Sequence, residues 1–125
     1  MYTLAVRRDF IARHFLIGGD WGKENLPNSH HFLLEVQLAA GQLDSHGYLC
    51  DIVEVDRYLT EVVEYFGERM LNELPEFAGL NPSLEVFARI IADRLRASIL
   101  RDGITSMKIV LWEDKRAWAS YAVQS

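Results

Sequence analysis

The sequence predicts an α+β fold, in which two helices cover one face of a four-stranded antiparallel sheet. Two observations support this prediction. Apolar residues alternate with polar ones near both ends of the chain, as in half-buried strands, but recur every three or four residues in the middle, as in amphipathic helices. The strand patterns and the helix patterns are also segregated along the chain. The expected order is strand, strand, helix, helix, strand, strand.

The first two strands are expected at residues 2–14 and 28–40. Each shows a period of two, so one face of each strand is mainly apolar, with Arg8 as a charged exception in the first. Residues 15–27 contain three glycines that break the periodicity. We therefore expect a loop there, joining two strands that pair as an antiparallel hairpin.

A short apolar stretch at residues 47–52 follows a link rich in turn residues, and we expect it to add a strand to this hairpin. Cys50 within it is interpreted as a small buried apolar residue, because nothing nearby in the sequence would lower its pKa. The period then changes. Residues 54–71 carry an apolar stripe at helical spacing and an acidic first turn, which together predict an amphipathic helix.

The second helix is expected at residues 82–101, after a loop at residues 72–80. Asn81 followed by Pro82 is a favourable helix start, with asparagine as the cap and proline in the first turn. Asp102 and Gly103 are expected to end the helix. Two β-rich stretches, residues 105–113 and 116–123, then predict a closing hairpin with a tight link between them.

Size and composition favour one soluble domain that spans residues 1–125. The formal net charge is −5, which argues against nucleic acid or an anionic membrane as a partner. Cys50 is the one cysteine, so no internal disulfide can form, and a cytoplasmic location is expected. The first residues lack the apolar core of a signal peptide, and no apolar run is long enough to span a membrane. Strands that are apolar on both faces suggest a homo-oligomer.

Four histidines are the first candidates for chemistry. On a regular second strand, His30 shares the apolar face while His31 points to the other side, so the two cannot enter one site. His14 ends the apolar face of the first strand. A ligand or a metal could bind at this end of the sheet. The alternative is that His30 and His31 are ordinary residues at a loop edge and that His14 is a core histidine with its hydrogen bonds satisfied.

Six short segments, in this order, resemble motifs of the 6-pyruvoyltetrahydropterin synthase family and its relative 6-carboxytetrahydropterin synthase. They are FIARH at 10–14, KENLPNSHHF at 23–32, GYLCDI at 47–52, LNELPEF at 71–77, NPSLE at 81–85 and WED at 112–114. The resemblance covers nearly the whole chain. It implies the tunnelling fold, a four-stranded antiparallel sheet with two helices on one face, assembled into barrels of several subunits such as a trimer-based hexamer.

The resemblance also implies a zinc site. Members of the family bind zinc through three histidines, one on the first strand and two at the start of the second. Here His14 and His30 occupy two of these positions, and Asn28 replaces the middle histidine. Asparagine is a weak neutral oxygen ligand, so the lost imidazole is expected to weaken zinc binding. His31 is adjacent, but alternation turns it away unless the strand bulges.

The catalytic residues of the family are only partly matched. Its nucleophile or general base is a cysteine, and Glu24 stands at that position, as in some family members that act on the same dihydroneopterin substrate. A carboxylate can accept a proton if burial raises its pKa. The family also uses an Asp-His pair, which falls at Gly67 and Glu68 here, so that proton relay is absent.

Two further carboxylates match substrate-binding positions of the family. Glu113 corresponds to a glutamate that holds the amino and amide N–H groups of the pterin ring, and a carboxylate can accept both donors at once. Glu85 corresponds to a glutamate of the second helix, although a first-turn acid that stabilises the helix N-terminus explains it equally well. Asp51 matches an aspartate of the family, but we interpret it as a turn or cap residue.

Three functions remain compatible with these residues. The first is a metal-assisted lyase that acts on dihydroneopterin triphosphate or a related dihydropterin, with Glu24 moving a proton. The second is a non-catalytic protein that binds a pterin or a purine on the same scaffold. The third is an enzyme with altered chemistry, in which Glu24, Glu68 and His31 form a new group. Fold alone does not choose among them.

Overall fold

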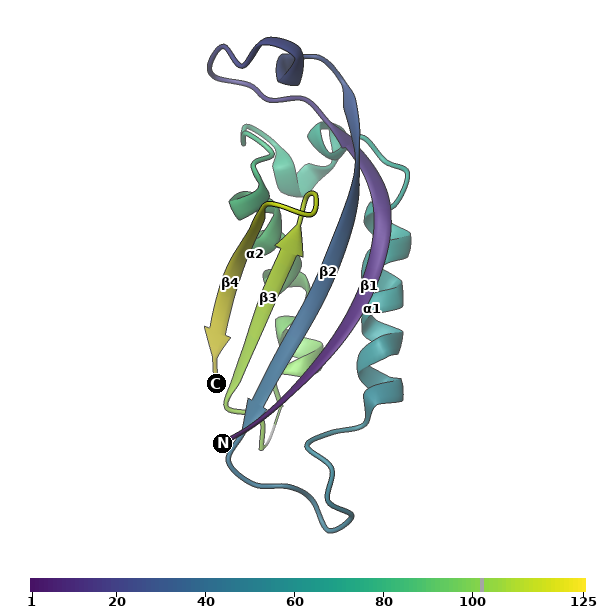
Figure 1. The fold of residues 1–125 in the computed structure, drawn as a ribbon, viewed down its shortest axis with the longest axis vertical. Coiled ribbons are helices and arrows are strands. Elements are labelled where there is room, and N and C mark those ends of the chain that lie inside the picture. Colours follow the sequence, from purple (N-terminus) through teal and green to yellow (C-terminus); the bar gives the residue numbers. More distant parts are fainter. Residues whose placement is uncertain (102) are drawn as a thin grey trace.

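The computed structural model describes residues 1–101 and 103–125 and has the architecture expected from the sequence. Its four strands form one antiparallel sheet in chain order: β1 (Tyr2–His14), β2 (Asn28–Ala40), β3 (Ser106–Trp112) and β4 (Trp118–Gln124). The two main helices are α1 (Ile52–Phe66) and α2 (Leu84–Ile99). In Figure 1, α2 lies behind β3 and β4, and α1 runs along β1. Three short 3₁₀ helices occupy connections: η1 (Gly22–Asn25), η2 (Leu71–Glu73) and η3 (Pro75–Phe77).

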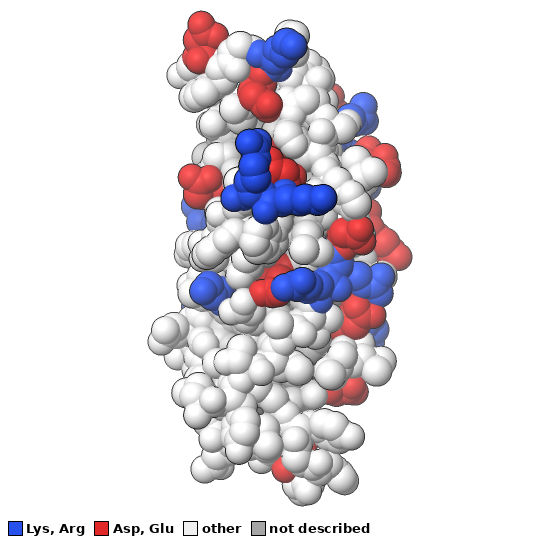
Figure 2. Space-filling model, viewed as in Figure 1, with Lys and Arg blue, Asp and Glu red and all other residues white. Residues whose placement is uncertain are grey.

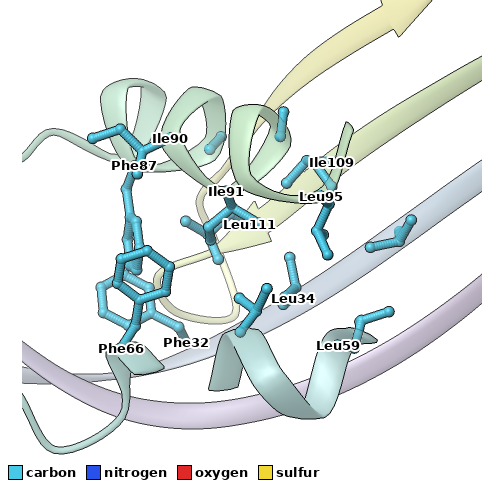
Figure 3. Close-up of a cluster of buried hydrophobic side chains, with 14 of the residues drawn as sticks. Phe32, Leu34, Leu59, Phe66, Phe87, Ile90, Ile91, Leu95, Ile109 and Leu111 are labelled. Atoms are coloured by element: carbon cyan, nitrogen blue, oxygen red, sulfur yellow. The ribbon is translucent and has the colours of Figure 1, made fainter. Parts of the chain in front are cut away.

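The core lies between the sheet and the helices, because the apolar face of each strand meets the apolar stripes of α1 and α2. Phe87 of α2 is at one end of this core (Figure 3). Its ring contacts those of Phe32 and Phe66, each with centroids 5.2 Å away, in edge-to-face geometry. This aromatic group lies directly beneath the end of the sheet at which β1 stops and β2 begins, and it supports the side chains there.

Arg8 shares the helix-facing side of β1, and the structure explains why a charge is tolerated there. Its guanidinium reaches α1 and forms two hydrogen bonds with Asp56, from Nε at 2.9 Å and from Nη2 at 2.8 Å. A two-point pair between a guanidinium and a carboxylate is stronger than a single hydrogen bond. Arg8, the charged exception in the strand pattern, therefore links the sheet to α1.

The opposite face of the sheet is mixed. It carries charged side chains such as Arg7 and Glu35 beside apolar ones such as Leu33 and Val110, so the expectation of strands that are apolar on both faces is met only in part. Glu35 of β2 lies on this face and is only 7% exposed. Arg7 Nε on the neighbouring strand lies 2.6 Å from Glu35 Oε1, and Gln37 Nε2 donates to Glu35 Oε2 at 2.5 Å. Figure 2 shows this face, with basic and acidic side chains next to one another across the middle of the molecule.

Glu35 gives a prediction for acid unfolding. The hydrogen bond from Gln37 and the pairing with Arg7 hold the pKa of Glu35 below its usual value, although burial opposes them. A carboxyl with a lowered folded-state pKa stabilises the fold at pH values above its unfolded pKa, and this stabilisation is lost as the pH falls through the folded pKa. We expect Glu35→Gln to reduce the free energy of unfolding by roughly 1.5–3 kcal/mol at neutral pH.

The difference between Glu35→Gln and the parent protein should shrink as the pH falls from about 5 toward 3, where the parent carboxyl becomes protonated. Urea unfolding at several pH values measures it. The matched control is Glu61→Gln, on the exposed surface of α1. A stability difference that stays constant down to the lowest pH would show that the charge of Glu35 contributes nothing.

The expected strand at residues 47–52 is absent. This stretch belongs to the connection between β2 and α1, and Ile52 is already the first residue of α1. Instead, Asp44 Oδ1 accepts the N–H groups of His46 and Tyr48 in an exposed loop. Asp51 is the N-cap of α1 and accepts the N–H of Val53 at 2.9 Å, which confirms its interpretation as a cap.

The cap of α2 is Ser83 rather than Asn81, because Ser83 Oγ accepts the N–H of Val86 at 3.1 Å. The helix ends at Ile99, earlier than expected, and Asp102, expected to help end it, lies outside the described residues. Within the described part of the chain, no helix combines the length and the apolar character needed to cross a membrane.

Candidate functional site

Two histidines meet at the end of the β1–β2 hairpin. His14, the last residue of β1, is directly opposite Asn28, the first residue of β2, and Ala12 is opposite His30. With a period of two on each strand, His14, Asn28 and His30 all face the helix side of the sheet. The rings of His14 and His30 are tilted against each other, with centroids 4.7 Å apart. The alternation of the sequence therefore placed both histidines correctly.

Three side-chain atoms at this end of the hairpin are buried without a hydrogen-bond partner: His14 Nε2, His30 Nε2 and Asn28 Oδ1. The Asn28 amide is oriented by its nitrogen, which donates to the carbonyl oxygens of His14 at 3.1 Å and Leu26 at 2.8 Å. Leaving a buried polar atom unpaired costs about 1–3 kcal/mol, so such atoms call for an explanation such as a bound ion. These three are potential metal-binding atoms.

Glu113, which follows β3, brings a carboxylate to the same place. Its Oε1 is 3.5 Å from His30 Nε2 and 3.8 Å from His14 Nε2. One ligand atom from each of these three residues lies within 4.8 Å of the other two, so the group could hold a metal ion. Two imidazoles with a carboxylate form a donor set that suits zinc.

The environment of this group shifts the pKa values of His14 and Glu113. Burial, and then the neighbouring His30, lower the pKa of His14 to about 4, against an opposing effect of Glu24. Its imidazole is therefore neutral near neutral pH, which is the form that binds metals. Burial raises the pKa of Glu113 above its usual value. His30 opposes this shift, and nearby carboxylates, led by that of Glu24, add to it.

Glu24 reaches the site from η1, in the loop that connects β1 and β2. Its Oε2 is 3.8 Å from His30 Nε2, and its side chain is 48% exposed. The loop is fixed locally, since the N–H of Leu16 donates to the Glu24 carbonyl at 2.8 Å and Asn25 Nδ2 donates to the carbonyls of Leu16 and Gly19, both at 3.0 Å. A carboxylate held beside a histidine, and still open to solvent, can exchange protons with a bound molecule.

The side chains of His14, Glu24, His30 and Glu113 line one cavity of about 830 Å³, which is large enough for a small organic molecule. Its acidic lining residues are Glu24, Glu85, Glu113 and Asp114. Trp21 from the β1–β2 loop and Trp118 at the start of β4 add aromatic surface, and both rings are about half exposed. The cavity thus combines two histidines, several carboxylates and two flat apolar surfaces that suit a planar ring.

The family model for 6-pyruvoyl tetrahydropterin synthase matches residues 3–124, nearly the full length of the chain. The chain belongs to this family. No match was found among curated proteins.

Solved structures of 6-pyruvoyl tetrahydropterin synthases have the same fold. The Caenorhabditis elegans enzyme is 20% identical, with a TM-score of 0.82, and the match covers 98% of this chain and 96% of the other. The Plasmodium falciparum enzyme is 13% identical, with a TM-score of 0.82 and coverage of 99% and 98%. A Plasmodium vivax enzyme in which a catalytic glutamate is replaced by alanine is 12% identical, with a TM-score of 0.75 and coverage of 99% and 98%.

Several polar residues lie away from the site of this 6-pyruvoyl tetrahydropterin synthase family member. His31 faces the mixed side of the sheet, as alternation predicted, and its Nε2 is 2.7 Å from Asp9 Oδ2. Glu68 is exposed, with a φ of 61°, and its N–H donates to the Ile11 carbonyl at 2.6 Å. Neither lines the cavity of Glu24. Within the described chain, the group of Glu24, Glu68 and His31 is therefore not assembled, and His46 lies in the loop at the other end of the sheet.

Sequence reasoning missed how the β1–β2 loop is attached to the rest of the fold. Asn72 Oδ1 accepts the N–H of Phe15 at 2.9 Å, and Asn81 Oδ1 accepts the N–H of Ile17 at 2.8 Å. Asn81 therefore anchors the loop that carries Glu24 instead of capping α2. Asparagine before proline is common both at helix caps and in loops. The sequence pattern alone therefore could not show whether Asn81 caps α2 or binds another loop. The two tryptophans of the cavity were also missed.

Proposed function

We propose that this protein is a metal-assisted carbon–oxygen lyase that acts on a dihydropterin with a hydroxylated side chain. The observation that carries the proposal is the close group of ligand atoms from His14, His30 and Glu113, in which both histidine Nε2 atoms are buried without a partner. The unpartnered Asn28 Oδ1 belongs to the residue directly opposite His14 in the hairpin. Membership of the 6-pyruvoyl tetrahydropterin synthase family supports the ligand class. The aromatic and acidic lining of the cavity suits a planar ring that is rich in N–H groups.

His14, His30 and Asn28 are the residues that we assign to a zinc ion. The assignment follows from the neutral state of His14, the shared face of the three side chains and their lack of other partners. A bound zinc ion would act as a Lewis acid and lower the pKa of a coordinated hydroxyl group. Asparagine binds more weakly than the histidine of the family, so we expect a lower zinc affinity than three imidazoles would give.

Glu24 is the residue that we assign to proton transfer. Its carboxylate lies at the His30 side of the cavity, where a substrate side chain held near the histidines would come within its reach. The Plasmodium vivax relative, in which a glutamate is described as catalytic, supports a glutamate in this role. We assign Glu113 and Glu85 to the substrate: Glu113 as acceptor for the ring N–H groups, and Glu85 at the wall formed by α2.

A homo-oligomer, built as a trimer-based hexamer in the cytoplasm, is part of the proposal. The edge strands β1 and β4 support it, because within the described chain no other strand pairs with their outer sides, apart from a short bridge between residues 11–13 of β1 and 68–70. The mixed face carrying Arg7 and Glu35 would then line the inside of a barrel, where charged side chains can stay hydrated. A reducing compartment suits the single free Cys50.

A non-catalytic pterin- or purine-binding protein is the second candidate. Two observations favour it: Asn28 replaces an imidazole, and Gly67 and Glu68 replace the Asp-His pair of the family. Such a protein would keep Glu113 and the aromatic walls but would not need a metal. Metal content therefore separates the two candidates.

Measuring zinc in the purified protein by plasma mass spectrometry tests the proposal. We expect about one zinc ion per chain, and most of it should be lost in His14→Ala and in His30→Ala. Asn28→Ala should weaken zinc retention during dialysis against a chelator, and Asn28→His should strengthen it. The control is His46→Ala, an exposed histidine in the loop that follows β2. Protein that stays free of zinc after incubation with an excess would exclude the metal-assisted lyase and favour the binding protein.

A further inference from the structure

The position of the Glu24 carboxylate depends on how the backbone of its loop is held. Glu24 Oε2 is 3.8 Å from His30 Nε2, which is too long for a hydrogen bond, so this histidine does not fix the carboxylate. A displacement of about 1 Å at a reacting group can cost about 100-fold in rate. The contacts that hold the backbone of residue 24 therefore bear directly on the proposed proton transfer.

The backbone of Glu24 is attached to the first residues of the same loop. The Leu16 N–H donates to the Glu24 carbonyl at 2.8 Å, and the Leu16 carbonyl accepts from Asn25 Nδ2 at 3.0 Å. Leu16 thus binds residue 24 through its N–H and the following residue through its carbonyl. A shift of Leu16 would be passed on to Glu24 through these bonds.

Two asparagines from distant parts of the chain fix the residues on either side of Leu16. Asn72 of η2 binds Phe15 at two points: its Oδ1 accepts the Phe15 N–H at 2.9 Å, and its Nδ2 donates to the Phe15 carbonyl at 2.8 Å. Asn81, which precedes α2, accepts the Ile17 N–H through its Oδ1 at 2.8 Å. These three hydrogen bonds hold both ends of a short segment whose middle residue is Leu16.

Both asparagines are themselves attached to the core. Leu71, directly before Asn72, is fully buried, and Pro82, directly after Asn81, is also buried. The side chains of the two asparagines therefore extend from parts of the fold that packing keeps in place. All of these contacts lie within one chain, so they do not require a second copy.

We infer that Asn72 and Asn81 are positioning residues, which act on the proposed proton transfer through Glu24. The inference rests on the proposed function and adds two residues to it. An amide side chain does not titrate near neutral pH, so neither asparagine can replace the carboxylate as a proton acceptor. Together they fix residues 15–17 on the core, and that segment holds Glu24 beside His30.

A double-mutant cycle between Asn72→Ala and Glu24→Gln tests this inference, with zinc-loaded protein and dihydroneopterin triphosphate as the substrate. We expect Asn72→Ala alone to lower kcat by roughly 10–100-fold, with a change in KM below about threefold. In the Glu24→Gln background, the same replacement should lower kcat by no more than about twofold, because the group that Asn72 positions has been removed. The control is Gln42→Ala, an exposed amide side chain in the connection between β2 and α1, which should leave kcat unchanged.

Hydrogen exchange measures the loop itself, without zinc or substrate. The amide protons of residues 15–26 should exchange at least about fivefold faster in Asn72→Ala than in the parent protein, because hydrogen bonds that hold the loop are lost. Asn81→Ala is the second variant for both measurements. We expect a smaller effect from it, since it removes one hydrogen bond instead of two.

The outcomes separate this inference from the proposed function. A loss of kcat that is equally large with and without the Glu24 carboxylate would overturn the inference and leave the proposed function intact, because Asn72 would then not act through Glu24. Full kcat in both alanine variants, or unchanged hydrogen exchange in both, would overturn it as well. Absence of turnover in the zinc-loaded parent protein would overturn the inference together with the proposed function.

Discussion

Replacing Glu24 by glutamine is expected to lower the turnover of a dihydropterin by roughly 10²–10⁴-fold, the usual contribution of a positioned general acid or base. Glutamine has nearly the same size, so the hydrogen bonds of the Glu24 backbone within the loop should persist. It cannot accept a proton at neutral pH. Steady-state kinetics on the zinc-loaded protein measure the effect, and we expect it in kcat rather than in KM.

The matched control for this variant is Glu64→Gln, on the exposed side of α1 and outside the cavity. It should turn over substrate like the parent protein. Zinc content and pterin affinity should be unchanged in Glu24→Gln, since the assigned zinc ligands and Glu113 are intact. A variant that keeps full activity would show that another group moves the proton, and the role assigned to Glu24 would have to be abandoned.

Replacing Glu113 by glutamine is expected to weaken pterin binding by roughly 30-fold or more, which corresponds to a loss of about 2 kcal/mol. The carboxylate offers two acceptor oxygens to the ring, whereas the amide offers one oxygen and places a donor opposite a donor. The partial burial of Glu113 raises the cost of that mismatch. Calorimetry with a neutral dihydropterin measures the change in affinity.

Zinc retention in Glu113→Gln separates two roles of this carboxylate, because Glu113 Oε1 also lies beside both histidines. Retained zinc with weakened pterin binding would support the assignment to the ring. Loss of zinc together with pterin binding would identify Glu113 as a metal ligand and contradict that assignment. Glu61→Gln on α1 serves as the charge-matched control for both measurements.

The strands and helices were predictable because their patterns are long. A period of two over residues 2–14 and 28–40 fixed which side chains share a face, and so brought His14 and His30 together. The strand expected at residues 47–52 had a strand-like composition, but strand pairing is a property of the whole sheet, and this stretch instead leads directly into α1, which begins at Ile52. Short segments carry too little periodicity to reveal such competition.

The site was predictable where it depends on strands and less so where it depends on loops. Alternation explains the position of His30. The return of Glu24 to within 3.8 Å of it depends on a loop whose backbone N–H groups donate to Asn72 and Asn81, far along the chain. The resemblance to a family supplied Glu24 and Glu113 as candidates. It could not supply the acidic lining of the cavity, whose four carboxylates come from three separated segments of the chain.

The pairing of His14 with Asn28 across the β1–β2 hairpin has an evolutionary consequence. The three proposed zinc ligands come from one local hairpin, whereas most of the cavity wall comes from residues 81–85 and 113–120. A lineage can therefore lose or regain a metal ligand without altering the surface that recognises the ring. Codons for asparagine and histidine differ by a single base, so position 28 lies one point mutation away from a three-histidine centre. Metal dependence in such a lineage is a readily reversible trait, while ring recognition changes more slowly.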